Sequence, residues 1–504
     1  MKKISIIIVS YNVKEYIKQC IRSIYRSNID KNKYEIIVID NDSHDGSVSL
    51  IKNNFPDVII HKNKCNEGFS KAVNVGIKIS KGEYVCILNP DVIIKENTFS
   101  ILIDFCKNNN LGAVGPKILN PDGNIQHSCK RSFPTPLNSI FRLIGLDKIF
   151  PKSKLFGKYN LTYLNINKLH EVDVISGAFM LIPRQIFSKI GFFDERFFMF
   201  AEDIDLCYRI KEAGYKIYYN PSAEIIHYKG ESVKTAPYDM INVFYSAMDL
   251  YFKKYAQKYK FWKYISIFVK SGLLIRKFIS YIKLALSKML SLFLDTFFII
   301  LSFCFSIYIW YSYKYDQTVD VSRIFYHSLM IINFIISWYF SSKIIQTYKQ
   351  NSLSFTRVFL SILLTFFISS TSTYFISFFA YSRGVLFFAT FLSAFFLIFW
   401  RLALKILYLN KIVYFKSFSH LIDRRALIIG SDRKSFEIGQ EINAYPDTDI
   451  NVIGYCDRDN PLLIENFLGK IEHIKQIVIK YKITEIIIRE AYFDSNTIFN
   501  IIKN

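Results

Sequence analysis

Two groups of acidic side chains in the N-terminal half of the sequence have the residue types that a metal-assisted group transfer needs. Asn89 and Asp91 belong to an Asn-Pro-Asp triplet that follows an apolar run. Glu202 and Asp203 follow the apolar residues 197–200. A carboxylate beside an amide can hold a hard cation such as Mg²⁺ or Mn²⁺ against a diphosphate. A second carboxylate in apolar surroundings has a raised pKa and can act as a general base.

Each of these groups also has an ordinary structural interpretation. An Asn-Pro-Asp triplet is typical of a turn. Glu202 and Asp203 could simply complement the dipole at the start of a helix. His227 follows an apolar pair, where a histidine is more often structural than a ligand. Asp40 and Asn41 could form an Asx turn or bind a nucleoside. Taken one by one, the residues leave both interpretations open.

The elements that must position these side chains alternate between strand and helix over residues 1–235. Three apolar runs are typical of strands, at residues 4–9, 35–40 and 83–88. Residues 14–26 have apolar positions at helical spacing. This repetition predicts a parallel α/β sheet, in which ligands bind at the carboxyl ends of the strands. Polar groups stand at those ends, at residues 10–12, 40–42 and 89–91.

The composition excludes a purely soluble protein. The chain has 504 residues, of which 51% are hydrophobic and only 21% are charged, so it is long enough for two to four domains. Its net charge of +22 would suit a nucleic-acid binder, but the long uncharged runs with 47 Phe and 34 Tyr would not. We therefore expect a lipid membrane as a partner and no nucleic acid.

Four uncharged stretches are long enough to cross a bilayer, at residues 296–313, 324–342, 358–382 and 384–400. They predict four transmembrane helices within residues 290–410. The flanking loops rich in Lys and Arg place both termini in the cytoplasm. The alternative is a buried soluble helical bundle. Residues 236–289 interleave basic and apolar positions, which predicts amphipathic helices on the membrane surface, or else helices packed on the preceding domain.

Residues 424–504 return to an alternation of strands and helices. This pattern predicts one half of a Rossmann-like α/β domain. Gly430 and Gly439 are nine residues apart, whereas phosphate binding needs a G-x-G-x-x-G spacing. We therefore expect a structural or regulatory domain rather than a nucleotide-binding one.

Ordered motifs in residues 1–235 resemble the glycosyltransferases of family 2, which have the GT-A fold, and especially their rhamnosyltransferase-like branch. The motifs are IIIVSYN at 6–12, VIDNDSHDGS at 38–47, NEGF at 66–69, NPD at 89–91, SGAF at 176–179 and EDID at 202–205. The resemblance implies an inverting transferase whose donor is a nucleotide sugar, with thymidine diphosphate rhamnose as a guess. The triplet at 89–91 stands where many relatives have two or three acids.

The resemblance also implies a role for each candidate residue. The nucleotide-sugar donor would be bound by Ser10, Tyr11, Asp40, Asn41 and Asn89. Asp91 would hold Mg²⁺ or Mn²⁺, and His227 would touch the metal or the diphosphate. Asp203 would be the catalytic base, assisted by Glu202.

The rest of the chain resembles the N-terminal part of membrane polyprenyl-phosphate sugar-phosphate transferases. In that family a catalytic domain follows the Rossmann-like region, and this sequence ends at Asn504 without one. Residues 290–504 are therefore expected to form a membrane and regulatory module.

Together these features predict a multi-pass enzyme of the bacterial inner membrane. It would move a sugar from a nucleotide donor to a polyprenyl-diphosphate-linked saccharide in cell-surface polysaccharide biosynthesis. One alternative is a membrane scaffold that docks a separate polyprenyl-phosphate sugar-phosphate transferase. Another is an initiating sugar-1-phosphate transferase, which would need the missing catalytic domain. The expected domains are residues 1–235, 236–289, 290–410 and 424–504.

Overall fold

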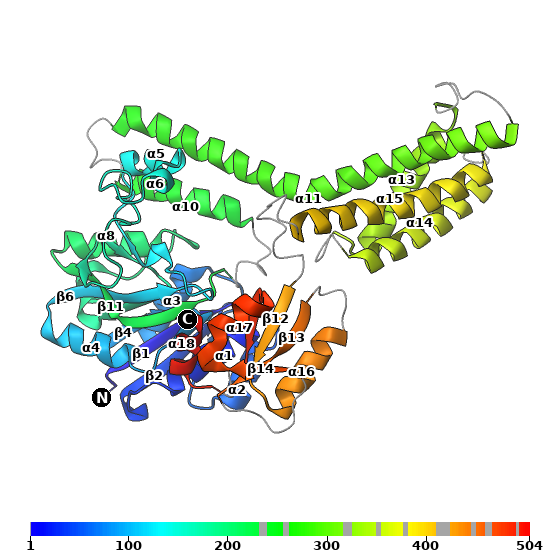
Figure 1. Cartoon of the computed structure of the whole chain (residues 1–504). Coiled ribbons are helices and arrows are strands. Elements are labelled where there is room, and N and C mark those ends of the chain that lie inside the picture. The colour runs from blue at the N-terminus through cyan, green and yellow to red at the C-terminus, as the bar shows by residue number, and fades with distance from the viewer. Residues whose placement is uncertain are drawn as a thin grey trace. The chain divides into compact units, whose positions relative to one another are not determined.

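The computed structural model divides into two compact units (Figure 1). The first comprises Met1–Tyr281 with Glu490–Asn504, and the second comprises Ile282–Arg489. The described residues are 2–230, 239–255, 262–315, 325–348, 354–375, 382–409, 424–444, 450–458, 466–489 and 493–503.

A nine-stranded mixed sheet forms the centre of the first unit, in the order β3-β2-β1-β4-β10-β6-β11-β5, with β8 paired to β11. These strands are β1 (Ile4–Ser10), β2 (Tyr34–Asp40), β3 (Ile59–Lys62), β4 (Tyr84–Leu88), β5 (Val92–Ile94), β6 (Leu111–Leu119), β8 (His170–Glu171), β10 (Phe179–Pro183) and β11 (Lys216–His227). A separate pair joins β7 (Lys130–Arg131) to β9 (Val174–Ile175).

The expectation of a parallel sheet is correct for β3, β2, β1 and β4 and for the pair of β6 and β11, and it is wrong for the strands between and beside them. Ile6 of β1 pairs in parallel with Ile36 and with Cys86. In contrast, β10 is antiparallel to β4, and β5 is antiparallel to β11. The chain between the end of β4 and the start of β5 is too short to bring β5 back parallel to β4, because a parallel connection needs a crossover of about a dozen residues.

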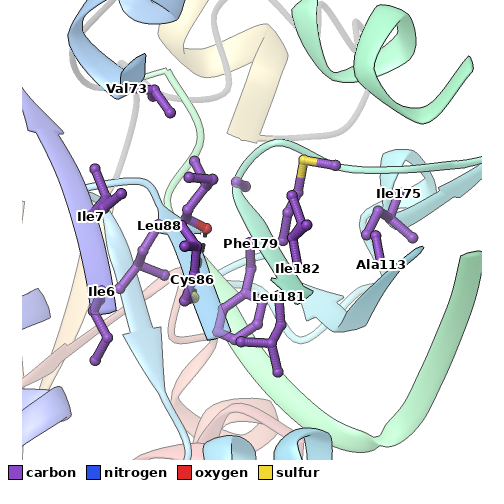
Figure 2. Close-up of a cluster of buried hydrophobic side chains, with 14 of the residues drawn as sticks. Ile6, Ile7, Val73, Cys86, Leu88, Ala113, Ile175, Phe179, Leu181 and Ile182 are labelled. Atoms are coloured by element: carbon purple, nitrogen blue, oxygen red, sulfur yellow. Dashed lines mark hydrogen bonds between the residues drawn. The ribbon is translucent and has the colours of Figure 1, made fainter. Parts of the chain in front are cut away.

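The core of this unit lies on both faces of the central strands, as the unbroken apolar runs of the sequence require. All seven residues of β1 and all seven of β2 are buried. Figure 2 shows buried side chains of the neighbouring strands β1, β4 and β10, among them Ile6 and Ile7 on opposite faces of β1. The covering helices include α1 (Lys14–Tyr25), α2 (Ser47–Asn54), α3 (Phe69–Ile79), α4 (Thr98–Asn108) and α8 (Glu202–Glu212).

The remainder of the first unit is helical. It contains α5 (Pro136–Leu143), α6 (Leu146–Ile149), α7 (Arg184–Ile190), α10 (Met240–Tyr255), the beginning of α11 (Trp262–Tyr315) and α18 (Ser495–Lys503). The boundary that we expected between residues 289 and 290 lies inside α11. Residues 236–238 and 256–261 of the expected surface helices lie outside the described residues.

Among its described residues, the second unit holds three helices that are long and apolar enough to cross a membrane. They are Leu290–Lys314 of α11, Phe355–Phe375, which is α14, and Arg383–Leu407 of α15 (Arg383–Leu409). The prediction of four spans is therefore wrong. The stretch 324–342 forms α13 (Ser328–Ile344), whose 17 residues reach about 26 Å, less than the roughly 30 Å of hydrocarbon. Residues 324 and 376–381 of the expected stretches lie outside the described part.

A buried ion pair joins two of these helices. Asp295 and Arg401 are both 0% exposed, and their side chains form two hydrogen bonds of 2.7 and 2.8 Å. Trp400 Nε1 and the Tyr348 hydroxyl also donate to Asp295, at 2.9 and 2.5 Å. An intramembrane carboxylate is stable only with partners of this kind.

The C-terminal part of the second unit is a four-stranded parallel α/β sheet in the order β14-β13-β12-β15. Its strands are β12 (Arg424–Ile429), β13 (Ile450–Asp457), β14 (Phe467–Lys470) and β15 (Glu485–Ile488). Two described helices accompany them, α16 (Arg433–Ala444) and α17 (Ile474–Tyr481). The alternation predicted for residues 424–504 thus forms a parallel sheet.

Candidate active site

A cavity of about 460 Å³ opens at the carboxyl ends of β1, β2 and β4. Most of the residues singled out in the sequence line it: Tyr11, Asn41, Asn89, Asp91, Glu202, Asp203 and His227. Ser10 and Asp40 end β1 and β2 and are fully buried behind this lining. The opposite wall is apolar, with Phe198, Met199 and Phe200. The chain therefore brings the candidate residues to one edge of the sheet.

Asp91 and His227 face each other in this cavity. Their strands are paired through Val92 of β5 and His227 of β11, which sets the two side chains close together. Nε2 of His227 lies 3.2 Å from Oδ1 of Asp91, and Nδ1 lies 2.9 Å from Oε1 of Gln126. Because Gln126 Oε1 is an acceptor, Nδ1 donates this hydrogen bond, and Nε2 is the nitrogen that faces Asp91.

This pair fits a divalent cation. Oδ1 of Asp91 has no hydrogen-bond donor among the described residues, although it is buried. The separation of 3.2 Å is close to the roughly 3 Å between neighbouring ligands of an octahedral ion with bonds of about 2.1 Å. The described part of the chain offers no cluster of three His, Cys, Asp or Glu ligands. Oxygens of a bound diphosphate would therefore have to complete the coordination.

The two acidic residues at the start of α8 are held in the cavity by an unusual turn. Phe200 and Ala201 both have positive φ, 71° and 62°, which costs energy in residues other than glycine. Glu202 and Asp203 lie in the first turn of α8, so they also complement its dipole. The structural interpretation of the pair thus applies, and both side chains also line the cavity.

The environments of the two carboxylates differ. Oδ2 of Asp203 accepts hydrogen bonds from Arg131 Nη2 at 2.5 Å and from the Gly177 amide at 3.1 Å. Oε2 of Glu202 is buried and has no partner among the described residues. Burial, and then repulsion by Asp203, raise the pKa of Glu202 to about 8. Glu202 is therefore protonated near neutral pH, whereas Asp203 is held by its hydrogen bonds from Arg131 and Gly177.

Gly68 ties the NEGF motif to the apolar wall. Its φ is +86°, and a Cβ there would lie 2.7 Å from the Phe198 carbonyl oxygen. The Phe69 amide donates to that same oxygen at 2.6 Å. Only glycine allows the backbone to come this close to Phe198, so the NEGF motif packs against the apolar residues 197–200.

The polar groups at the ends of β1 and β2 are largely used within the protein. The Ser43 amide donates to Oδ1 of Asp40 at 3.0 Å, as in an Asx turn. The side chain of Asn41 donates to Gly68 O and accepts from Asn63. Asp40 Oδ2 and Ser10 Oγ have no hydrogen-bond partner among the described residues. Ser10 and Asp40 are buried beneath the cavity and form its floor without lining it, whereas Tyr11 and Asn41 line it.

Sequence reasoning missed Arg131, Gln126 and Lys229. Gln126 and Lys229 line the cavity, and Arg131 holds Asp203. An isolated basic or amide residue belongs to no periodic pattern or spaced motif. The only signal in the sequence was the adjacent pair Lys130 and Arg131, in a stretch without a helical or strand pattern.

Two family models match different parts of the chain. Residues 5–191 match the family model described as glycosyl transferase family 2. The first unit carries a family 2 glycosyltransferase domain. Residues 342–504 match the model described as a CoA-binding domain. The similarity noted above to the N-terminal part of polyprenyl-phosphate sugar-phosphate transferases is consistent with this second match.

Relatives of the glycosyltransferase domain carry names of the same kind. The N-acetylglucosaminyl-diphospho-decaprenol L-rhamnosyltransferase of Mycobacterium tuberculosis is 29% identical over 244 residues, which are 46% of this chain and 78% of that protein. The rhamnosyltransferase WbbL of Escherichia coli K12 is 26% identical, over 44% of this chain and 82% of that protein. A solved mannosyltransferase from Pyrobaculum calidifontis, in complex with GDP-Man and Mn²⁺, has a TM-score of 0.36 and 17% identity, over 55% of this chain and 70% of that one.

Proposed function

We propose that this glycosyltransferase inverts the configuration of the sugar that it transfers, from a nucleotide-sugar donor to a polyprenyl-diphosphate-linked saccharide. The main support is that Asp91, His227 and Asp203 line one cavity in the unit that carries the family 2 match. The relatives named above act on a lipid-linked acceptor or transfer rhamnose by their names, which favours a role in cell-surface polysaccharide biosynthesis.

The donor would lie across the carboxyl ends of β1, β2 and β4. Tyr11, Asn41 and Asn89 would contact it, and Ser10 and Asp40 would shape the floor beneath. Asp91 and His227 would hold Mg²⁺ or Mn²⁺, which neutralises the charge that develops on the leaving diphosphate. Asn89 Nδ2 lies 3.4 Å from Nε2 of His227, so the amide stands at the same point of the cavity.

Asp203 would be the general base and Glu202 its assistant. The acceptor hydroxyl oxygen attacks the anomeric carbon while the bond to the donor phosphate breaks, and its proton passes to Asp203. The electron pair of the broken bond leaves with the nucleoside diphosphate. Glu202 is protonated because its pKa is about 8, so its carboxyl group can donate a hydrogen bond to the acceptor.

The membrane region would keep this site close to a lipid-linked acceptor. We propose an inner-membrane location for the multi-pass chain, with the donor site and both termini in the cytoplasm. That orientation needs an even number of crossings, which the three candidate spans alone do not supply. Labelling of single cysteines added at each terminus with an impermeant thiol reagent, in right-side-out vesicles, decides it: protection of both termini is expected, and labelling of one would refute it.

We keep the expected domain bounds as a proposal: 1–235, 236–289, 290–410 and 424–504. The C-terminal parallel sheet would be half of a Rossmann-like domain with a structural or regulatory role. Residues 236–289 would lie on the membrane surface, and residues 290–410 would span the membrane.

The test uses the purified full-length protein in detergent with Mg²⁺ or Mn²⁺ and a panel of nucleotide sugars. Release of a nucleoside diphosphate from one donor, in the presence of membrane lipid extract as acceptor, is expected. Asp203→Asn should abolish the release. If no donor were used, and no nucleoside diphosphate bound, the proposal would fail in favour of a scaffold role.

A further inference from the structure

A second cavity, of about 330 Å³, adjoins the first one within the same unit. Gln126, Ser128 and Lys229 line both cavities. The other residues of the second cavity are Asn120, Ile125, His127, Arg131, Arg142, Tyr159, Asn160 and Phe244. The proposed reaction leaves this second space unused.

The second cavity is strongly cationic. Arg131, Arg142 and Lys229 line it, and none of its described lining residues is acidic. The only carboxylate paired with these three cations in the described structure is Asp203, bound to Arg131 from the side of the first cavity. Such a cluster is stabilised by a bound anion.

Two buried donors in this cavity have no acceptor among the described residues. They are Nε of Arg131 and Nε2 of Gln126, whose side chain is 4% exposed. Since Oε1 of Gln126 accepts the proton of His227 Nδ1, the amide nitrogen is free to face another ligand. Buried donors of this kind are normally satisfied, so they point to an oxygen-rich ligand.

The surface next to the second cavity is apolar. Arg142 belongs to α5, and its guanidinium carbon lies 4.5 Å from the centroid of the Tyr159 ring, in a cation–π contact. Large apolar side chains of α5, α6 and the segments beside them are exposed: Leu137, Ile144, Ile149, Phe150 and Leu155. Arg276 of α11 donates to the Arg142 carbonyl at 3.2 Å, and Figure 1 shows α5 and α6 beside this part of α11.

The same part of α11 exposes further large apolar side chains. They are Leu274, Ile275, Phe278 and Ile279, all more than half exposed. A cationic cavity beside an exposed apolar surface suits an amphiphile with an anionic head and a hydrocarbon tail.

We propose that the second cavity binds the diphosphate of the lipid-linked acceptor through Arg131, Arg142 and Lys229. The inference rests on the proposed function, because the acceptor hydroxyl must reach Asp203, and Arg131 joins Asp203 to this cavity. The hydrocarbon tail then lies along α5 and α11, and the saccharide extends into the first cavity. The donor diphosphate has the same chemistry, so the test must separate the two sources.

The experiment measures binding by the full-length protein in detergent, without turnover. The probes are a short-chain isoprenyl diphosphate, the isoprenyl alcohol of equal length, and a nucleoside diphosphate with Mn²⁺. Wild-type protein should bind the isoprenyl diphosphate at least tenfold more tightly than the alcohol. Arg142→Gln and Lys229→Gln should each weaken the isoprenyl diphosphate by about tenfold, since a charged hydrogen bond is lost. The Kd of the nucleoside diphosphate should change less than twofold in Arg142→Gln.

Lys148→Gln is the matched control, because Lys148 is an exposed cation on α6 that lines neither cavity. Equal effects of Arg142→Gln and Lys148→Gln on the isoprenyl diphosphate would overturn the proposal. A loss of nucleoside diphosphate affinity equal to that of the isoprenyl diphosphate would assign the cations to the donor and overturn it too.

The binding readout is independent of catalysis. Arginine-dependent binding of the isoprenyl diphosphate by a protein that transfers no sugar would refute the proposed function and keep the subsite. Sugar transfer to a lipid acceptor with an unchanged acceptor KM in Arg142→Gln would refute the subsite and keep the function. Arg142 is exposed, so the substitution Arg142→Gln should not disturb folding. An apparent Tm equal to that of the wild type checks this.

Discussion

Arg131 donates a hydrogen bond of 2.5 Å from Nη2 to Oδ2 of Asp203, and only 12% of each side chain is exposed. The pair joins the short strand β7 to the first turn of α8. This charge-assisted hydrogen bond fixes the position of the carboxylate, which lines the cavity. Arg131 is therefore a positioning residue for the proposed base, and it also faces the second cavity.

Asp203→Asn should lower kcat by roughly 10²- to 10⁴-fold, the usual contribution of a general base. The affinity for nucleoside diphosphate should stay within about twofold, because Asp203 acts on the acceptor. Steady-state kinetics and a binding titration on the same preparation measure both. Asp104→Asn, on an exposed position of α4, is the control and should behave as wild type. Full activity in Asp203→Asn would show that another group takes the proton.

Glu202→Gln should remove a pH dependence of stability. Burial and the charge of Asp203 raise the pKa of Glu202 to about 8 in the folded protein, against about 4.3 in an unfolded chain. Between these values the folded state holds a proton that the unfolded state has released. Wild-type stability therefore falls as the pH rises from about 4 to about 8, by at most about 1.4 kcal/mol per pH unit.

Glutamine keeps the uncharged form at every pH. The apparent Tm of Glu202→Gln should thus rise relative to wild type between about pH 6 and about pH 8.5. Glu212→Gln, at the exposed end of α8, is the control, and the difference between its apparent Tm and that of the wild type should not change with pH. A constant difference in Tm between Glu202→Gln and wild type at both pH values would contradict the raised pKa.

Asp91→Asn should weaken metal-dependent binding of the donor. Asp91 and His227 are the described pair that fits a cation, so the loss of one charge removes the stronger ligand. Titration of a nucleoside diphosphate with and without Mn²⁺ should show at least a tenfold gain from the metal in wild type and little gain in the variant. Chelation by EDTA should bring wild type to the level of Asp91→Asn. Identical metal dependence in both proteins would remove Asp91 from the site.

Arg401→Met should destabilise the membrane region strongly. It leaves Asp295, which is 0% exposed, without its cation, and breaking a buried pair costs about 3–5 kcal/mol. The double variant Asp295→Asn with Arg401→Met should recover much of the loss, since no isolated charge remains. Thermal unfolding of the full-length proteins in detergent gives the comparison. Additive losses in the double variant would show that the two residues act independently.

The sequence by itself determined the elements and the polar groups at their ends. Residues 6–9 and 36–39 are apolar at every position because β1 and β2 are buried on both faces, and that pattern is local. Asp91 and Asp203 could be selected because an acidic residue within a few positions of the end of an apolar run is visible in the chain itself. The length of an apolar run was a weaker guide, because the run at 324–342 does not say where its helix begins.

Only the tertiary structure decided which of these groups meet. The contact of Asp91 with His227 depends on the pairing of β5 with β11, and the antiparallel entry of β10 could not be read from spacing. The Arg131–Asp203 pair and the second cavity arise from segments far apart in sequence. Periodicity encodes burial and local conformation, whereas contacts between distant segments depend on how the whole chain closes its core. The positions that carry the further inference were therefore invisible before the fold was known.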